Sequence, residues 1–294
     1  MRLSMFAAGL ALALSASPVL ADSAAHKPKP AAATLDRAVA EIQRALDEQR
    51  LMDAGRLLDD AALAGADDPR LILLDGELEL QRGRLSDALG DFTQAANSPV
   101  TAARGLQGEG LVLSLTGASE KALPILQSAV AKDPTAWRAW NALGSEYDAR
   151  GQWGQAEAAY QTALTASGGA AIVLNNRGYS RLLQRRREEA VADLVAALRK
   201  KPDLAEARTN LRLALAMGGD YDGALAGGSP GDKAALLNNA GFAAAMRGDY
   251  HTALDLLNRA IATKSEYYER ASENLKIVQA LAGPAQAQQA HAAP

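Results

Sequence analysis

The chain has 294 residues, of which 48% are hydrophobic, 22% are charged and only 4% are aromatic. Since Ala and Leu dominate and β-branched or aromatic residues are scarce, the composition does not fit a β-sandwich or barrel and predicts an all-α fold. The net charge of −3 argues against a cationic surface for nucleic acid, and the absence of Cys excludes disulfides, thiolate chemistry and a thioether lipid anchor.

The N-terminal segment has the features of a secretory signal peptide. Arg2 supplies a positive charge, residues 3–14 are nearly all apolar, and small residues precede the expected cut. An uncleaved membrane anchor is the alternative, but this apolar run is well short of the roughly 20 residues that span a bilayer. We therefore expect residues 1–21 to be cut off after Ala21, which would make the protein periplasmic or secreted and leave it without a transmembrane span.

Beyond this segment, residues recur with a period of 34, which indicates stacked structural repeats. One glycine row, two alanine rows and a row of bulky residues share the register. The rows are Gly76, Gly110, Gly144 and Gly178; Ala54, Ala88, Ala122, Ala156 and Ala190; Ala61, Ala95, Ala129, Ala163 and Ala197; and Leu58, Phe92, Leu126, Tyr160 and Leu194. Such a register predicts a linear array of one repeated unit.

Residues 137–170 form the best preserved unit, and each half has the spacing of an amphipathic helix. The residues on these two faces are Trp140, Leu143, Gly144 and Tyr147, followed by Ala156, Tyr160 and Ala163. The unit resembles the tetratricopeptide repeat. This resemblance implies a right-handed solenoid of stacked antiparallel helix pairs, in which the first helix of each pair lines a concave face.

The register divides the chain into about seven repeats and a C-terminal capping helix. The predicted parts after the signal peptide are a Pro- and Ala-rich linker at 22–34; units at 35–68, 69–102, 103–136, 137–170, 171–204, 205–233 and 234–267; a cap at 268–283; and a disordered tail at 284–294. Residues 35–283 are therefore expected to form one solenoid.

The sixth unit, 205–233, has 29 residues in place of 34, and the missing residues belong to its second helix. After Asp222 the chain soon reaches Gly227, Gly228 and Pro230, which must end that helix early. Because each repeat is stabilised only by its neighbours, we expect this thin unit to be the weakest link of the array and a hinge.

No set of catalytic residues is evident in the sequence. The three histidines, His26, His251 and His291, lie in the linker, on a helix and in the tail, so no two share a site. Carboxylate pairs fall on predicted helix surfaces, and glycines recur singly, unlike those of a phosphate-binding loop. We predict no enzyme activity, no metal and no cofactor, and expect protein or peptide partners.

Six asparagines occupy two neighbouring positions of the first helices, namely Asn141, Asn175, Asn176, Asn210, Asn238 and Asn239. These positions flank the packing row, so the side chains are predicted to point into the concave groove. Because an amide both donates and accepts hydrogen bonds, a ladder of amides is suited to hold the backbone of an extended peptide. The alternative is that Asn only tolerates a polar, solvated face.

Four arginines lie on the first helices of the fifth and sixth units, three of them where other units have packing residues. They are Arg177, Arg181, Arg208 and Arg212. An unpaired buried guanidinium is costly, so the site must be open or paired. If it is open, it is a docking site for an acidic partner segment. If it is paired, Asp203 and Glu206 are candidate carboxylates.

The C-terminal half carries a closer resemblance. Residues 174–225, 236–261 and 272–281, including Asn274 and Leu275, are similar to the TadD-type proteins of Flp (tight-adherence) pilus assembly. This resemblance implies a non-catalytic envelope scaffold for the pilus secretion machinery, with its secretin as a partner. Members are commonly lipoproteins, but this chain has no Cys to acylate. A periplasmic adaptor of other cell-envelope machinery is the alternative, and an enzyme or small-ligand binder is the third hypothesis.

Overall fold

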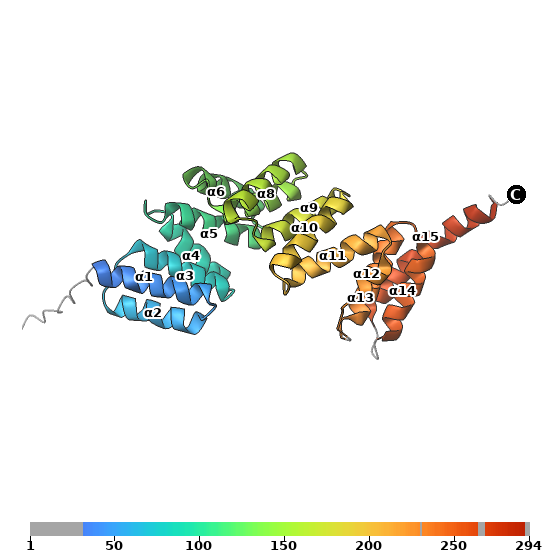
Figure 1. The fold of residues 1–294 in the computed structure, drawn as a ribbon, viewed down its shortest axis with the longest axis horizontal. Coiled ribbons are helices and arrows are strands. Elements are labelled where there is room, and N and C mark those ends of the chain that lie inside the picture. The colour runs from blue at the N-terminus through green and yellow to red at the C-terminus, as the bar shows by residue number, and fades with distance from the viewer. Residues whose placement is uncertain (1–31, 230, 264–267, 292–294) are drawn as a thin grey trace, which may run out of the picture.

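The computed structural model describes residues 32–229, 231–263 and 268–291, and within these ranges the chain is helical with no strand (Figure 1). The helices are α1 (Ala32–Asp47), α2 (Leu51–Leu63), α3 (Pro69–Gln81), α4 (Leu85–Ala95), α5 (Ala102–Leu115), α6 (Ser119–Lys132), α7 (Trp137–Ala149), α8 (Trp153–Ser167), α9 (Ala171–Leu183), α10 (Arg187–Lys200), α11 (Ala205–Gly218), α12 (Tyr221–Leu225), α13 (Lys233–Met246), α14 (Tyr250–Thr263) and α15 (Glu269–His291). The predicted all-α class is confirmed.

Consecutive helices pack as pairs, one pair for each repeat. The pairs run from α1 with α2 to α13 with α14, and α15 packs against the last pair as a cap. Each second helix also contacts the first helix of the next pair, so the pairs follow one another along a single array (Figure 1). The predicted solenoid of seven helix pairs and a capping helix is confirmed.

Both ends of the solenoid differ from the predicted boundaries. Residues 32–34, expected in the linker, belong to α1, and α15 extends to His291 through most of the predicted disordered tail, 284–294. Ala and Gln, which fill most of the tail after Pro284, have high helix propensity. The signal peptide and linker residues 22–31 lie outside the described residues. Of the described helices, none is long and apolar enough to cross a membrane.

Glycines on the first helices make room for the bulky residues of the second helices. A methyl group added at Gly76 would lie 2.9 Å from the Phe92 ring, and one added at Gly144 would lie 2.5 Å from the Tyr160 ring. The Phe92 ring also packs directly against Gly108 in the next unit. Phe92 thus fills the space between two consecutive first helices. The alanine rows are buried, which lets the helix backbones approach closely.

The sixth unit departs from this packing because its second helix is short. α12 has five residues, whereas the second helices α4 and α8 have 11 and 15. Asp220 caps its start by accepting a hydrogen bond from the backbone N–H of Gly223 at 2.9 Å. Gly228 then stands at the register position of the bulky residue, and Arg212 stands at that of the receiving glycine. The early end of this helix, predicted from the glycines, is confirmed.

We expect limited proteolysis of the folded protein to cut first within residues 226–233. This stretch follows a five-residue helix that provides little packing for its neighbours, and segments with few buried contacts open most readily. A time course with a broad-specificity protease such as subtilisin, followed by intact-mass spectrometry, locates the first cut. The α10–α11 loop serves as an internal comparison, since it joins helices of full length. A first cut inside residues 103–204 would contradict the hinge.

Candidate partner-binding face

Four of the predicted asparagines form one chain of hydrogen bonds across α7, α9 and α11. Nδ2 of Asn210 donates to Oδ1 of Asn175 at 2.9 Å, and Asn175 donates to Asn176 at 3.0 Å. Asn176 in turn donates to Asn141 at 3.1 Å. The amides therefore bind one another, which the sequence did not reveal. Within the described part of the chain, Nδ2 of Asn141 and Oδ1 of Asn210 have no partner.

A second chain of amides joins α13 and α15. Nδ2 of Asn274 donates to Oδ1 of Asn238 at 2.9 Å, and Asn238 donates to Asn239 at 3.3 Å. Asn274 was not among the predicted site residues. Its separation of 36 residues from Asn238 is close to the repeat period, and this spacing is the signal that could have identified it.

Thr209 separates the two chains of hydrogen-bonded amides. It stands at the register position that Asn175 holds one unit earlier, but its Oγ1 donates to the backbone oxygen of Ala205 at 3.0 Å. Nδ2 of Asn239, which would otherwise reach this position, donates to no group among the described residues. The second chain of amides consequently ends in a free donor.

Two of the four predicted arginines are paired inside the array. Arg177 donates to both carboxylate oxygens of Asp193, at 2.8 and 2.7 Å. Arg181 donates to Asp193 at 2.8 Å and to Glu157 at 2.6 Å. Both arginine side chains are only 12% exposed. They form a closed ionic network that joins α8, α9 and α10.

This pairing corrects the expectation that Asp203 or Glu206 would neutralise the arginines, because both carboxylates come from second helices instead. Burial works to raise the pKa of Glu157, but the hydrogen bond from Arg181 and the charges of Arg181, Arg186 and Arg177 together hold that pKa below its usual value. Arg177 and Arg181 are thus already neutralised by groups of the same chain.

Arg208 and Arg212 lie outside the network. Nη2 of Arg208 donates to the backbone oxygen of Pro202 at 2.8 Å, and Nη2 of Arg212 donates to that of Ala226 at 3.1 Å. Within the described ranges neither guanidinium contacts a carboxylate. The predicted acidic docking set therefore divides into two saturated arginines and two whose charge is free.

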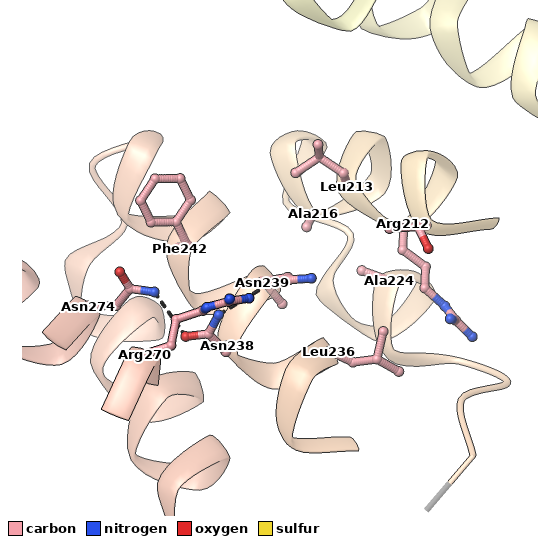
Figure 2. Close-up of a pocket in the computed structure, with 12 residues that line it drawn as sticks. Arg212, Leu213, Ala216, Ala224, Leu236, Asn238, Asn239, Phe242, Arg270 and Asn274 are labelled. Atoms are coloured by element: carbon pink, nitrogen blue, oxygen red, sulfur yellow. Dashed lines mark hydrogen bonds between the residues drawn. The ribbon is translucent and has the colours of Figure 1, made fainter. Parts of the chain in front are cut away.

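A pocket of about 420 Å³ lies beside the short sixth unit, between α11, α12, α13 and α15 (Figure 2). Its apolar wall includes Leu213, Leu236 and Phe242, and its polar groups include Arg212, Asn239, Arg270 and Asn274. Figure 2 shows these side chains coming from both sides of the space between α11 and α13. This surface offers a ligand apolar contacts, hydrogen-bonding groups and positive charge.

No three His, Asp or Glu side chains of the described residues are placed to hold a metal ion. One carboxyl group is strongly perturbed, because burial and the charges of Asp75 and Glu79 raise the pKa of Asp91 to about 6. Asp91 lies on α4 and belongs to neither the amide chains nor the pocket.

Comparison with known proteins identifies the fold. No family model matches the sequence, and no curated protein is similar enough to count as a match. A tetratricopeptide repeat protein of known structure from Parabacteroides merdae is similar over 84% of this chain and 99% of its own, with 16% identity and a TM-score of 0.52. A thermophilic tetratricopeptide repeat protein from Thermus thermophilus is similar over 61% of this chain and 98% of its own, with 20% identity and a TM-score of 0.53.

The structure of the APC/C hetero-tetramer Cut9–Hcn1 is also similar. It matches 83% of this chain with 16% identity and a TM-score of 0.63, and the match spans 49% of its own chain. These likenesses agree with the 34-residue register and the stacked helix pairs. The chain therefore has the fold of the tetratricopeptide repeat proteins.

Proposed function

We propose that the protein is a non-catalytic scaffold that holds an extended segment of a partner protein along the face formed by α7, α9, α11 and α13. The observation that carries this proposal is the pair of amide chains, of which the first crosses α7, α9 and α11 and the second joins α13 to α15. Each amide has two N–H groups and two lone pairs on its oxygen, so bonding to its neighbours leaves atoms for a peptide backbone.

The shape of this face supports the same proposal. A shallow groove of about 500 Å³ runs along Asn175, Asn176, Tyr179 and Asn210. Tyr179 in α9 and Phe242 in α13 share a register position on this face and are 43% and 46% exposed. Aromatic side chains in such positions are suited to contact the side chains of a bound segment.

The place of action belongs to the proposal as well. The signal-like residues 1–21 favour export to the periplasm, and the resemblance of the C-terminal half to TadD-type proteins favours a role in Flp pilus assembly. We therefore propose an envelope scaffold whose partners include a component of the pilus secretion machinery, such as its secretin.

The test is affinity capture from envelope extract with a variant in which Asn176 and Asn210 are both replaced by alanine. We expect the affinity for the partner to fall by about 30-fold, because two lost hydrogen bonds of about 1 kcal/mol each amount to about 2 kcal/mol. Asn97→Ala is the matched control, since this amide only donates to the backbone oxygen of Thr93 on an exposed surface. Mass spectrometry identifies the partner, and its identity separates pilus assembly from other envelope machinery.

A second variant covers the risk that loss of the amides unfolds the array. Tyr179→Glu leaves both amide chains intact and places a charge in the groove, so it should also reduce recovery. Circular dichroism shows whether each variant is folded. Full recovery of the partner by both folded variants would refute the peptide-binding face.

A further inference from the structure

The pocket beside the sixth unit occupies the place of a missing side chain. In the second unit, Phe92 lies between Gly76 on its own first helix and Gly108 on the next one. The 34-residue register, corrected for the five missing residues, gives the equivalent positions in the sixth unit. Gly228 is equivalent to Phe92, Arg212 to Gly76, and Asn239 to Gly108. Arg212 and Asn239 both line the pocket.

The chain fills this space only in part. Arg212 turns toward the end of α12, where it donates to the backbone oxygen of Ala226 at 3.1 Å, and Leu236 packs directly against Gly228. A pocket of about 420 Å³ remains, with Leu213 and Phe242 on its wall. The regular array buries a large side chain here, so the space is suited to accept one from another molecule.

The rim of the pocket carries positive charge and a free donor. Arg212 and Arg270 line the pocket, and neither forms an ion pair with any described residue. Asn239, whose Nδ2 donates to no group of the described residues, ends the second amide chain at the pocket. Arg177 and Arg181, by contrast, are saturated by Asp193 and Glu157. The free charge at the pocket is therefore complementary to an acidic ligand.

We propose that this pocket binds an acidic segment of a partner protein, which inserts one large apolar side chain into the space left by the missing second-helix residue. The class of that side chain follows from its equivalents in this chain, which are Phe92, Leu126, Tyr160, Leu194 and Leu257. An adjacent carboxylate pairs with Arg212 or Arg270, and a backbone oxygen accepts from Asn239. The inference rests on the proposed function and adds the chemistry of the bound segment.

The absence of Cys from the chain permits a direct test. Thr209→Cys places a single thiol on the rim of the pocket, at an exposed side chain. Three probes, each a dipeptide joined to cysteamine and supplied as a disulfide, exchange with this thiol at increasing concentrations of a thiol reductant. The first carries Asp-Phe, the second has alanine in place of phenylalanine, and the third has lysine in place of aspartate. Intact-mass spectrometry measures the labelled fraction. We expect the aspartyl-phenylalanine probe to withstand about tenfold more reductant than either of the others, equivalent to about 1.4 kcal/mol.

Variants in the Thr209→Cys background assign the preference to the pocket. Ala240→Leu restores the large residue that Leu143 provides in the fourth unit and should fill the pocket, so the preference for phenylalanine should vanish. Arg212→Glu should reduce the preference for aspartate, since only Arg270 then remains to pair with it. Arg208→Glu makes the same change of charge on the same helix but does not line the pocket, so it should keep both preferences.

Equal labelling by the three probes would overturn the inference. A preference for phenylalanine that survives Ala240→Leu, in a protein whose circular dichroism is unchanged, would overturn it as well. The outcomes also separate this inference from the proposed function. Equal labelling with normal capture of the partner would overturn the pocket alone. Selective labelling with full capture by both groove variants, Asn176→Ala/Asn210→Ala and Tyr179→Glu, would overturn the peptide-binding face alone.

Discussion

Replacing Asp193 with alanine is expected to lower the free energy of unfolding by about 3–5 kcal/mol. Asp193 accepts hydrogen bonds from both Arg177 and Arg181, and its side chain is 7% exposed. Its removal leaves two largely buried guanidinium groups without their shared counter-charge, and an uncompensated buried charge costs more than the intact pair contributes. Urea denaturation followed by circular dichroism measures the change.

An exposed ion pair provides the control for this prediction. Arg56 and Asp60 are paired at 3.2 Å on α2, and their side chains are 64% and 61% exposed. Asp60→Ala should therefore change stability by no more than about 1 kcal/mol. Similar losses for Asp193→Ala and Asp60→Ala would show that the network between α8, α9 and α10 is not buried in solution.

Replacing Tyr160 with alanine is expected to cost about 3–5 kcal/mol as well, through a different mechanism. The Tyr160 side chain is 1% exposed and its ring packs against Gly144, so alanine leaves a cavity between α7 and α8. The glycine offers no side chain that could move into this space. Thermal unfolding monitored by circular dichroism should show a markedly lower midpoint.

Two milder changes at the same residue separate ring volume from hydrogen bonding. Tyr160→Leu supplies the residue that the third and fifth units use at this position, so it should cost clearly less than alanine. Tyr160→Phe keeps the ring and loses the hydrogen bond that the hydroxyl donates to Asp148 at 2.9 Å, so we expect a loss of about 1 kcal/mol. If leucine proved as damaging as alanine, packing against the glycine would not explain the stability.

The short sixth unit links the predicted hinge to the proposed binding site. The short α12 offers less packing surface to α11 and α13 than a full second helix would, and the space that it leaves forms the pocket. A partner side chain inserted there would restore part of the missing contact. We therefore expect the bound segment to protect residues 226–233 from the first proteolytic cut, because a ligand that binds the closed form reduces local opening.

The architecture of this protein follows from short-range patterns in its amino-acid sequence. The 34-residue register located the helix pairs, the alanine rows and the capping helix. The shortening of α12 was also predictable, since Gly227, Gly228 and Pro230 act on the backbone locally. These features were accessible because helix periodicity and helix termination depend on residues close together in the chain. α15 extends beyond its predicted end at residue 283, so the Pro and Gln residues that follow do not terminate this helix.

The pairing of polar groups, by contrast, follows from how the helices pack in three dimensions. Asp193 lies 16 residues from Arg177 on a different helix, and Asn176 lies 35 residues from Asn141. A repeat register places such residues in neighbouring helices, but it does not determine the direction of the side chains or which carboxylate is within reach. The packing of helices far apart in the chain sets the distances over which ion pairs and hydrogen bonds act. It therefore decides the partners of the arginines, the bonds among the amides and the pocket at the sixth unit.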